Sequence, residues 1–86
     1  MPTIGAKSMV GELDTVILKV DLPGSGLAAG DLGTVVLVHQ GGKGYEVEFA
    51  TLDGETIAVV ALHPSQVRPV GRREIAHARP VEQMPA

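Results

Sequence analysis

Two glutamates, Glu46 and Glu48, come closest in type and spacing to a chemical site in this chain of 86 residues. One residue separates them, so on a strand both side chains project from the same face. A carboxylate pair of this kind can perform general acid–base chemistry or bind a divalent cation. No third ligand follows at a useful spacing, and a half-buried strand with one face in water gives the same pattern. We therefore interpret the pair as the acidic, solvated face of a strand.

The three histidines, His39, His63 and His77, are candidate metal ligands. The first two end predicted strands and the third lies near the C-terminus, so nothing in the sequence brings them together. Ser65 lies two residues after His63, but no nucleophile-elbow motif surrounds it. The sequence therefore predicts no metal, no cofactor and no catalytic residue, and we expect that the protein is not an enzyme.

Basic residues are concentrated at the C-terminal end. Arg68, Arg72 and Arg73 form a small cluster that could contact a phosphate or an acidic partner, and a solvated chain end is the alternative. Residues 1–70 carry four Lys and Arg against eight Asp and Glu, whereas residues 71–86 carry three against two. An acidic body repels phosphate backbones, which makes nucleic acid an unlikely main partner.

The elements that must position these side chains are short strands. Tyr45, Val47 and Phe49 alternate with the two glutamates, which is typical of a strand with one buried face. Pro64 ends the strand before it and predicts a single 3₁₀ turn over residues 63–66. Glycine-rich and proline-rich turns separate the predicted strands, which cover residues 14–20, 34–39, 45–49, 55–62 and 67–70.

This order of elements predicts an all-β fold, a small five-stranded SH3-like barrel with a 3₁₀ turn before the last strand and a flexible C-terminal tail. Residues 1–12 are expected to form an N-terminal arm, residues 13–70 the barrel, and residues 71–86 a tail that is flexible or docks on a partner. A five-stranded OB-like barrel is the alternative, but that fold usually carries a helix, for which the pattern leaves no room.

The first two strands are apolar on both faces. In the second strand, Val35 and Leu37 lie on one face and Val36 and Val38 on the other. In the first strand, Ile17 lies on the face opposite Val16 and Leu18. One small barrel cannot bury both sets, and spare apolar surface favours pairing with a second copy or another chain, or coverage by the tail. The candidate partner-binding residues are Glu46, Glu48, Val35, Leu37, Arg72 and Arg73.

The chain resembles a family of small bacterial proteins, the domain of unknown function 4926. The residues that carry this resemblance run in order through positions 13–70: Leu-Asp-Thr-Val at residues 13–16, Gly-Asp-Leu-Gly-Thr-Val-Val at 30–36, Tyr-Glu-Val-Glu-Phe at 45–49, Asp-Gly at 53–54 and Gln-Val-Arg-Pro at 66–69. The resemblance implies an SH3-like barrel and no particular activity. Weaker likenesses to KOW modules and to the β subunit of nitrile hydratase rest on the Gly-Asp turn and are analogies of fold.

We expect a non-catalytic protein-interaction module, for example an accessory subunit or a neutralising partner. It would bind its partner through an edge strand, the Glu46 and Glu48 face or the tail. The partner could also be a second copy of the chain, which would give a homo-oligomer. The alternatives are a nucleic-acid-associated module of the KOW kind and a small accessory subunit of a metalloenzyme. The sequence contains no cysteine, no signal-peptide pattern and no run of about 18 apolar residues, so we predict a cytoplasmic protein without a membrane partner.

Overall fold

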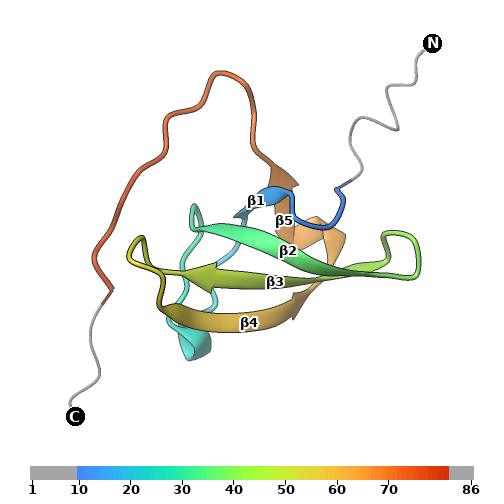
Figure 1. Ribbon diagram of the computed structural model, residues 1–86, viewed down its shortest axis with the longest axis horizontal. Coiled ribbons are helices and arrows are strands. Elements are labelled where there is room, and N and C mark those ends of the chain that lie inside the picture. The colour runs from blue at the N-terminus through green and yellow to red at the C-terminus, as the bar shows by residue number, and fades with distance from the viewer. Residues whose placement is uncertain (1–9, 82–86) are drawn as a thin grey trace.

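The computed structural model describes residues 10–81, which form one antiparallel β-sheet with two short 3₁₀ turns (Figure 1). The strands are β1 (Thr15–Leu18), β2 (Leu32–His39), β3 (Gly44–Ala50), β4 (Thr56–Leu62) and β5 (Val67–Pro69), and the turns are η1 (Pro23–Ser25) and η2 (Pro64–Gln66). The predicted all-β fold and the predicted 3₁₀ turn before the last strand are confirmed. The described residues include no helix with the length and apolar character needed to cross a membrane.

The sheet curls around its inner face but remains open along one side. Its strand order is β4-β3-β2-β1-β5, so β4 and β5 are the two edges. No pairing joins these two edges within residues 10–81. β5 has only three residues and ends at Pro69, which has no N–H to donate to a ladder. The SH3-like arrangement is therefore an open barrel.

The first strand is shorter than the sequence pattern predicts. β1 ends at Leu18, and the N–H of Lys19 donates to the carbonyl of Gln66 at 2.7 Å, in the turn before β5. Val20 consequently lies outside the strand and is exposed. Ile17 is buried, contrary to the simple alternation, although it does not belong to the main core cluster.

A β-bulge in β2 changes which of its four apolar residues point inward and which point outward. Val35 pairs with Val47 of β3, but the next paired residue is Leu37, opposite Glu46. Val36 is the extra residue of the bulge, so the inward and outward directions are shifted after it. Val35 is fully buried, whereas Val36 and Leu37 are 41% and 42% exposed. Val35 is therefore a core residue, and the prediction that it contacts a partner is wrong for this fold.

The core lies on the inner face of the sheet. Val16, Leu18, Val35 and Val47 are its fully buried members. Gly33 allows the strands to approach at this point, because a Cβ atom there would lie 2.5 Å from Cγ1 of Val47 and 2.8 Å from Cε2 of Phe49. Burial of each large apolar side chain contributes about 1.5–3 kcal/mol, so this layer stabilises the sheet.

The tail leaves β5, arcs away from the sheet and returns beside the β3–β4 hairpin (Figure 1). It has no regular secondary structure between residues 70 and 81. Two ion pairs hold it. Glu74 pairs with Arg68 at 2.7 Å near the start of the tail, and Arg79 pairs with Asp31 at 2.6 Å.

Candidate functional site

The outward-facing side chains of β2, β3 and β4 form one continuous surface, which we call the outer face. Its residues are Thr34, Val36, Leu37, Glu46, Glu48, Val59 and Ala61. The strand register places them in two cross-strand rows, Leu37–Glu46–Ala61 and Thr34–Glu48–Val59, with the bulged Val36 beside them. Residues directly opposite in such rows have Cβ atoms about 4.5–5.5 Å apart, so their side chains are neighbours on the surface. The outer face therefore joins the predicted residues Glu46, Glu48 and Leu37.

Both glutamates of the outer face are bonded to neighbours in the sheet. Oε2 of Glu46 lies 3.1 Å from Nε2 of His39, and Oε2 of Glu48 accepts a hydrogen bond from the hydroxyl of Thr56 at 2.5 Å. These contacts hold the carboxylates in place while leaving them in contact with water. Within residues 10–81, no three His, Asp or Glu side chains are grouped so that they could hold a metal ion. The chemistry that this arrangement supports is a fixed negative charge beside apolar surface.

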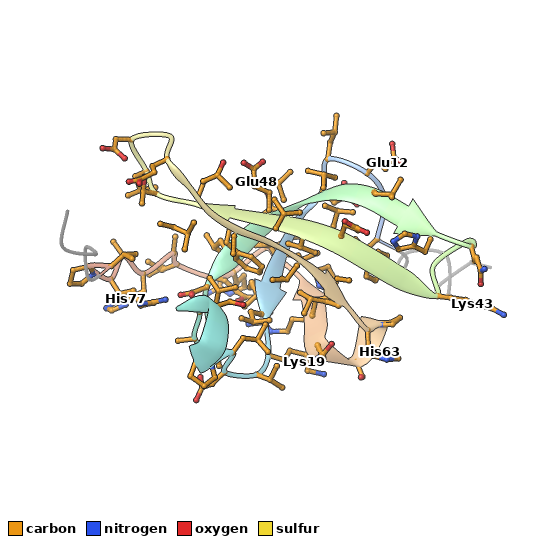
Figure 2. All side chains as sticks on the ribbon, turned by 90° about the horizontal axis from the view of Figure 1, so that it is seen from below. Glu12, Lys19, Lys43, Glu48, His63 and His77 are labelled. Carbon is orange, nitrogen blue, oxygen red and sulfur yellow. The ribbon has the colours of Figure 1, made fainter. Side chains whose placement is uncertain are left out.

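Apolar side chains lie exposed among these carboxylates. Val59 of β4 is 52% exposed, and Val36 and Leu37 of β2 are exposed to a similar degree. The turn that carries Glu12 lies on the same side of the molecule as Glu48 (Figure 2). The next residue in that turn, Leu13, is 79% exposed and has a φ of 71°, a left-handed backbone that strains a leucine.

The histidines do not converge. His39 ends β2 and contacts Glu46, whereas His63 and His77 lie at opposite ends of the molecule (Figure 2). His63 shapes the turn before β5 through its backbone: its N–H donates to Oε1 of Gln66 at 2.8 Å, and its carbonyl accepts from the N–H of Gln66 at 2.9 Å. His63 thus takes part in the predicted turn over residues 63–66 through its peptide groups.

The predicted arginine cluster is divided in the structure. The guanidinium of Arg68 donates two hydrogen bonds to Glu74, at 2.7 and 2.8 Å, and the N–H of Gly71 donates to the same carboxylate. These contacts lower the pKa of Glu74 to about 2, with the hydrogen bond from Arg68 as the largest cause. Arg72 and Arg73 follow in an exposed turn of the tail, and the outer face does not include them.

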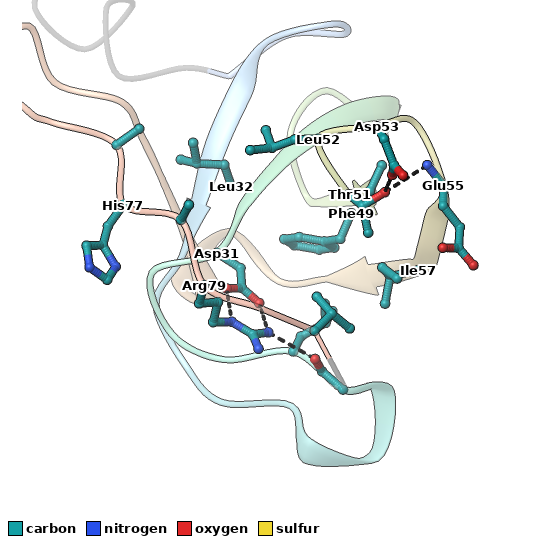
Figure 3. A pocket seen from close by; sticks show the side chains of 16 residues that line it. Asp31, Leu32, Phe49, Thr51, Leu52, Asp53, Glu55, Ile57, His77 and Arg79 are labelled. Atoms are coloured by element: carbon teal, nitrogen blue, oxygen red, sulfur yellow. Dashed lines mark hydrogen bonds and ion pairs between the residues drawn. The ribbon is translucent and has the colours of Figure 1, made fainter. Parts of the chain in front are cut away.

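A second cluster lies at the end of the sheet, where residues distant in the sequence meet (Figure 3). Arg79 of the tail donates to both carboxylate oxygens of Asp31, at 2.7 and 2.6 Å, and to the carbonyl of Gly26 at 3.0 Å. The pKa of Asp31 is lowered, mainly by the hydrogen bond from Arg79 and against the effect of its partial burial.

No pattern in the sequence predicts this second cluster. Its only local signal is Asp31 in a Gly-Asp turn, and such a residue is common in turns without a function. Arg79 is 48 residues away, so no spacing rule connects the two.

The comparisons with known proteins bear on the barrel alone. A family model with the description "Domain of unknown function (DUF4926)" matches residues 12–69, which include all five strands. No curated protein and no solved structure matches the chain.

Proposed function

We propose that this chain, which belongs to the DUF4926 family, is a non-catalytic module that binds another protein through its outer face. The observation that carries the proposal is the mixture on that face of uncovered apolar side chains and carboxylates held by their neighbours. Exposed Val36, Leu37 and Val59 provide area to remove from water. Glu46 and Glu48 provide a charge pattern that selects the partner.

The chemistry of the outer face defines the partner. Apolar side chains of the partner would cover Val36, Leu37 and Val59, and basic side chains would approach the two glutamates. A phosphate backbone has the wrong charge for this surface, so a protein partner fits it better than a nucleic acid.

The free edge of β4 supports the same proposal. β4 has the sequence Thr-Ile-Ala-Val-Val-Ala-Leu, without a charge or a proline, and pairs on one side with β3. Uncharged edges of this length accept an added strand readily, because charged residues and prolines are the usual protection against such pairing. A partner strand added to β4 would extend the row of the outer face that contains Val59.

A pull-down from the native host, followed by mass spectrometry, tests the proposal with a matched pair of variants. Val59→Lys places a charge in the apolar part of the outer face. Val20→Lys makes the same change at an exposed valine next to Lys19, which lies on the opposite side of the molecule from Glu48 (Figure 2). We expect the wild type and Val20→Lys to capture the same specific proteins, and Val59→Lys to lose them by at least about tenfold.

The captured protein is then purified and titrated against each form by calorimetry. A partner that binds all three forms equally contradicts the proposal, as does the absence of any protein above background. Light scattering on the pure wild type identifies the case in which the partner is a second copy. A dimer that Val59→Lys dissociates and Val20→Lys preserves would place the second copy on the outer face.

A further inference from the structure

A groove of about 580 Å³ lies at the end of the sheet, between the loop before β2, the β3–β4 hairpin and the tail (Figure 3). Its lining is apolar in the middle, where Leu27 and Phe49 of the core meet Ile57 of β4. Leu32 and Leu52 line it too and keep 42% and 96% of their surface exposed. The groove thus offers apolar contact area that residues 10–81 leave uncovered.

The sheet and its loops contribute only negative charge to this groove. Asp31 lies beside the Gly26 carbonyl, and Asp53 and Glu55 lie on the β3–β4 hairpin. Among the described lining residues, the one side chain with a permanent positive charge is Arg79, which comes from the tail. The groove is therefore complementary to a cationic segment of chain.

The acceptors for Arg79 are held in place by the loop that carries them. Oδ2 of Asp31 accepts a hydrogen bond from the N–H of Ala28 at 2.9 Å, and the N–H of Asp31 donates to the carbonyl of Ala28 at 3.0 Å. A carboxylate fixed in this way, together with the Gly26 carbonyl, gives three oriented acceptors for a planar guanidinium. Such bidentate geometry distinguishes arginine from lysine.

Arg79 pairs with Asp31, but the described tail residues do not fill the groove. The tail residues that line it with Arg79 are Ala76, His77, Ala78 and Val81, and the side chains of the two alanines are single methyl groups. With these residues in place, Leu32 and Leu52 still keep 42% and 96% of their surface exposed. A segment with larger apolar side chains in place of the two alanines would cover more of the groove with the same arginine contact.

We propose that this groove is a binding site for an extended segment of a partner protein that carries an arginine next to large apolar side chains, and that residues 76–81 occupy it in the free protein. The site is separate from the outer face, and the proposal does not rest on it. A tethered segment competes at an effective concentration of about millimolar, so the tail sets an affinity threshold that a partner segment must exceed.

Fluorescence anisotropy on the full-length protein tests this proposal, with a labelled peptide of residues 74–81 as the probe. Arg79→Ala frees the site from its own tail, and we expect it to bind the peptide at least about tenfold more tightly than the wild type. A peptide with Arg79→Gln should lose this binding. A peptide with Ala78→Leu should bind about threefold or more tightly, because its larger side chain removes more apolar area from water.

A matched pair of double variants separates recognition from folding. Asp31→Asn with Arg79→Ala keeps an oxygen acceptor for the Ala28 N–H but removes the charge, and it should lose peptide binding. Asp21→Asn with Arg79→Ala should bind like Arg79→Ala, since Asp21 bonds the N–H of Ala29 at 2.8 Å in the same loop and does not line the groove. Circular dichroism checks that both variants fold. The proposal is overturned by no saturable binding up to about 1 mM peptide, by equal affinity for wild type and Arg79→Ala, or by binding that a folded Asp31→Asn variant retains.

Discussion

The outer face and the groove at the end of the sheet hold their carboxylates in different ways. On the outer face, Glu46 and Glu48 bond to His39 and Thr56, which are seven and eight residues away and belong to the same sheet. At the groove, Asp31 bonds to Arg79, which is 48 residues away on a segment without regular structure.

Because of this difference, the outer face is a permanent surface, whereas the groove is an exchangeable site, which either the tail or another segment can occupy. The outer face is complete whenever β2, β3 and β4 are paired, so a partner finds it ready. The groove is covered in part by a tail that is anchored there by one side chain, Arg79, so another segment with the same arginine contact can replace it. Four predictions test whether the two regions are distinct in this sense.

The largest expected effect comes from β2, which has one side in the core and the other on the outer face. Gly33→Val forces a branched side chain against Val47 and Phe49, and the free energy of unfolding should fall by about 3 kcal/mol or more. Thr34→Val, one residue further and on the outer face, should change it by less than about 1 kcal/mol. Urea denaturation measures both. Equal effects at the two positions would show that the faces are not separated as described.

The next effect is on the motion of the tail. Arg79→Ala removes three hydrogen bonds to Asp31 and Gly26, so the NMR order parameters of residues 76–81 should fall from about 0.85 to below about 0.6. Glu46→Gln alters the outer face and should leave those values unchanged. A tail that stays rigid in Arg79→Ala is held by contacts other than this ion pair.

A smaller effect concerns pH. The pKa values of Asp31 and Glu74 are lowered in the folded protein, so their ion pairs are fully formed above the ordinary carboxyl values of 3.8 and 4.5. The pairs should be lost as the pH falls through the folded values, which for Glu74 means about pH 2. Carbon-13 NMR of the carboxyl groups gives both midpoints. Arg68→Gln should return the Glu74 midpoint toward 4.5 and leave that of Asp31 unchanged.

The smallest effect is at Leu13, in the turn on the same side of the molecule as the outer face. Its left-handed backbone costs a leucine about 1 kcal/mol, and asparagine tolerates this conformation better. Leu13→Asn should therefore preserve or slightly raise the free energy of unfolding, which a thermal melt measures. A clear loss of stability would show that the exposed side chain supports the fold.

The two regions differ as well in how far the sequence predicts them. Alternation of Tyr45 and Val47 with Glu46 and Glu48 is a local pattern, so the strand and its acidic face could be predicted. The burial of Val35 could not be predicted, because it depends on the bulge at Val36. That bulge follows from the register with β3 and changes, within one strand, which side chains point inward. The pair of Asp31 and Arg79 depends on the path of a tail without periodicity, for which spacing rules give no distance.

The proposed role of the outer face is tested most directly by NMR mapping of the purified partner on the wild-type protein. We predict that the amide signals that change most belong to the outer face, in particular to Leu37, Glu46 and Val59, while those of Asp31 and Arg79 keep their positions. Changes confined to the groove and the tail would contradict the account, because they would place the partner at the exchangeable site and leave the outer face without a role in binding.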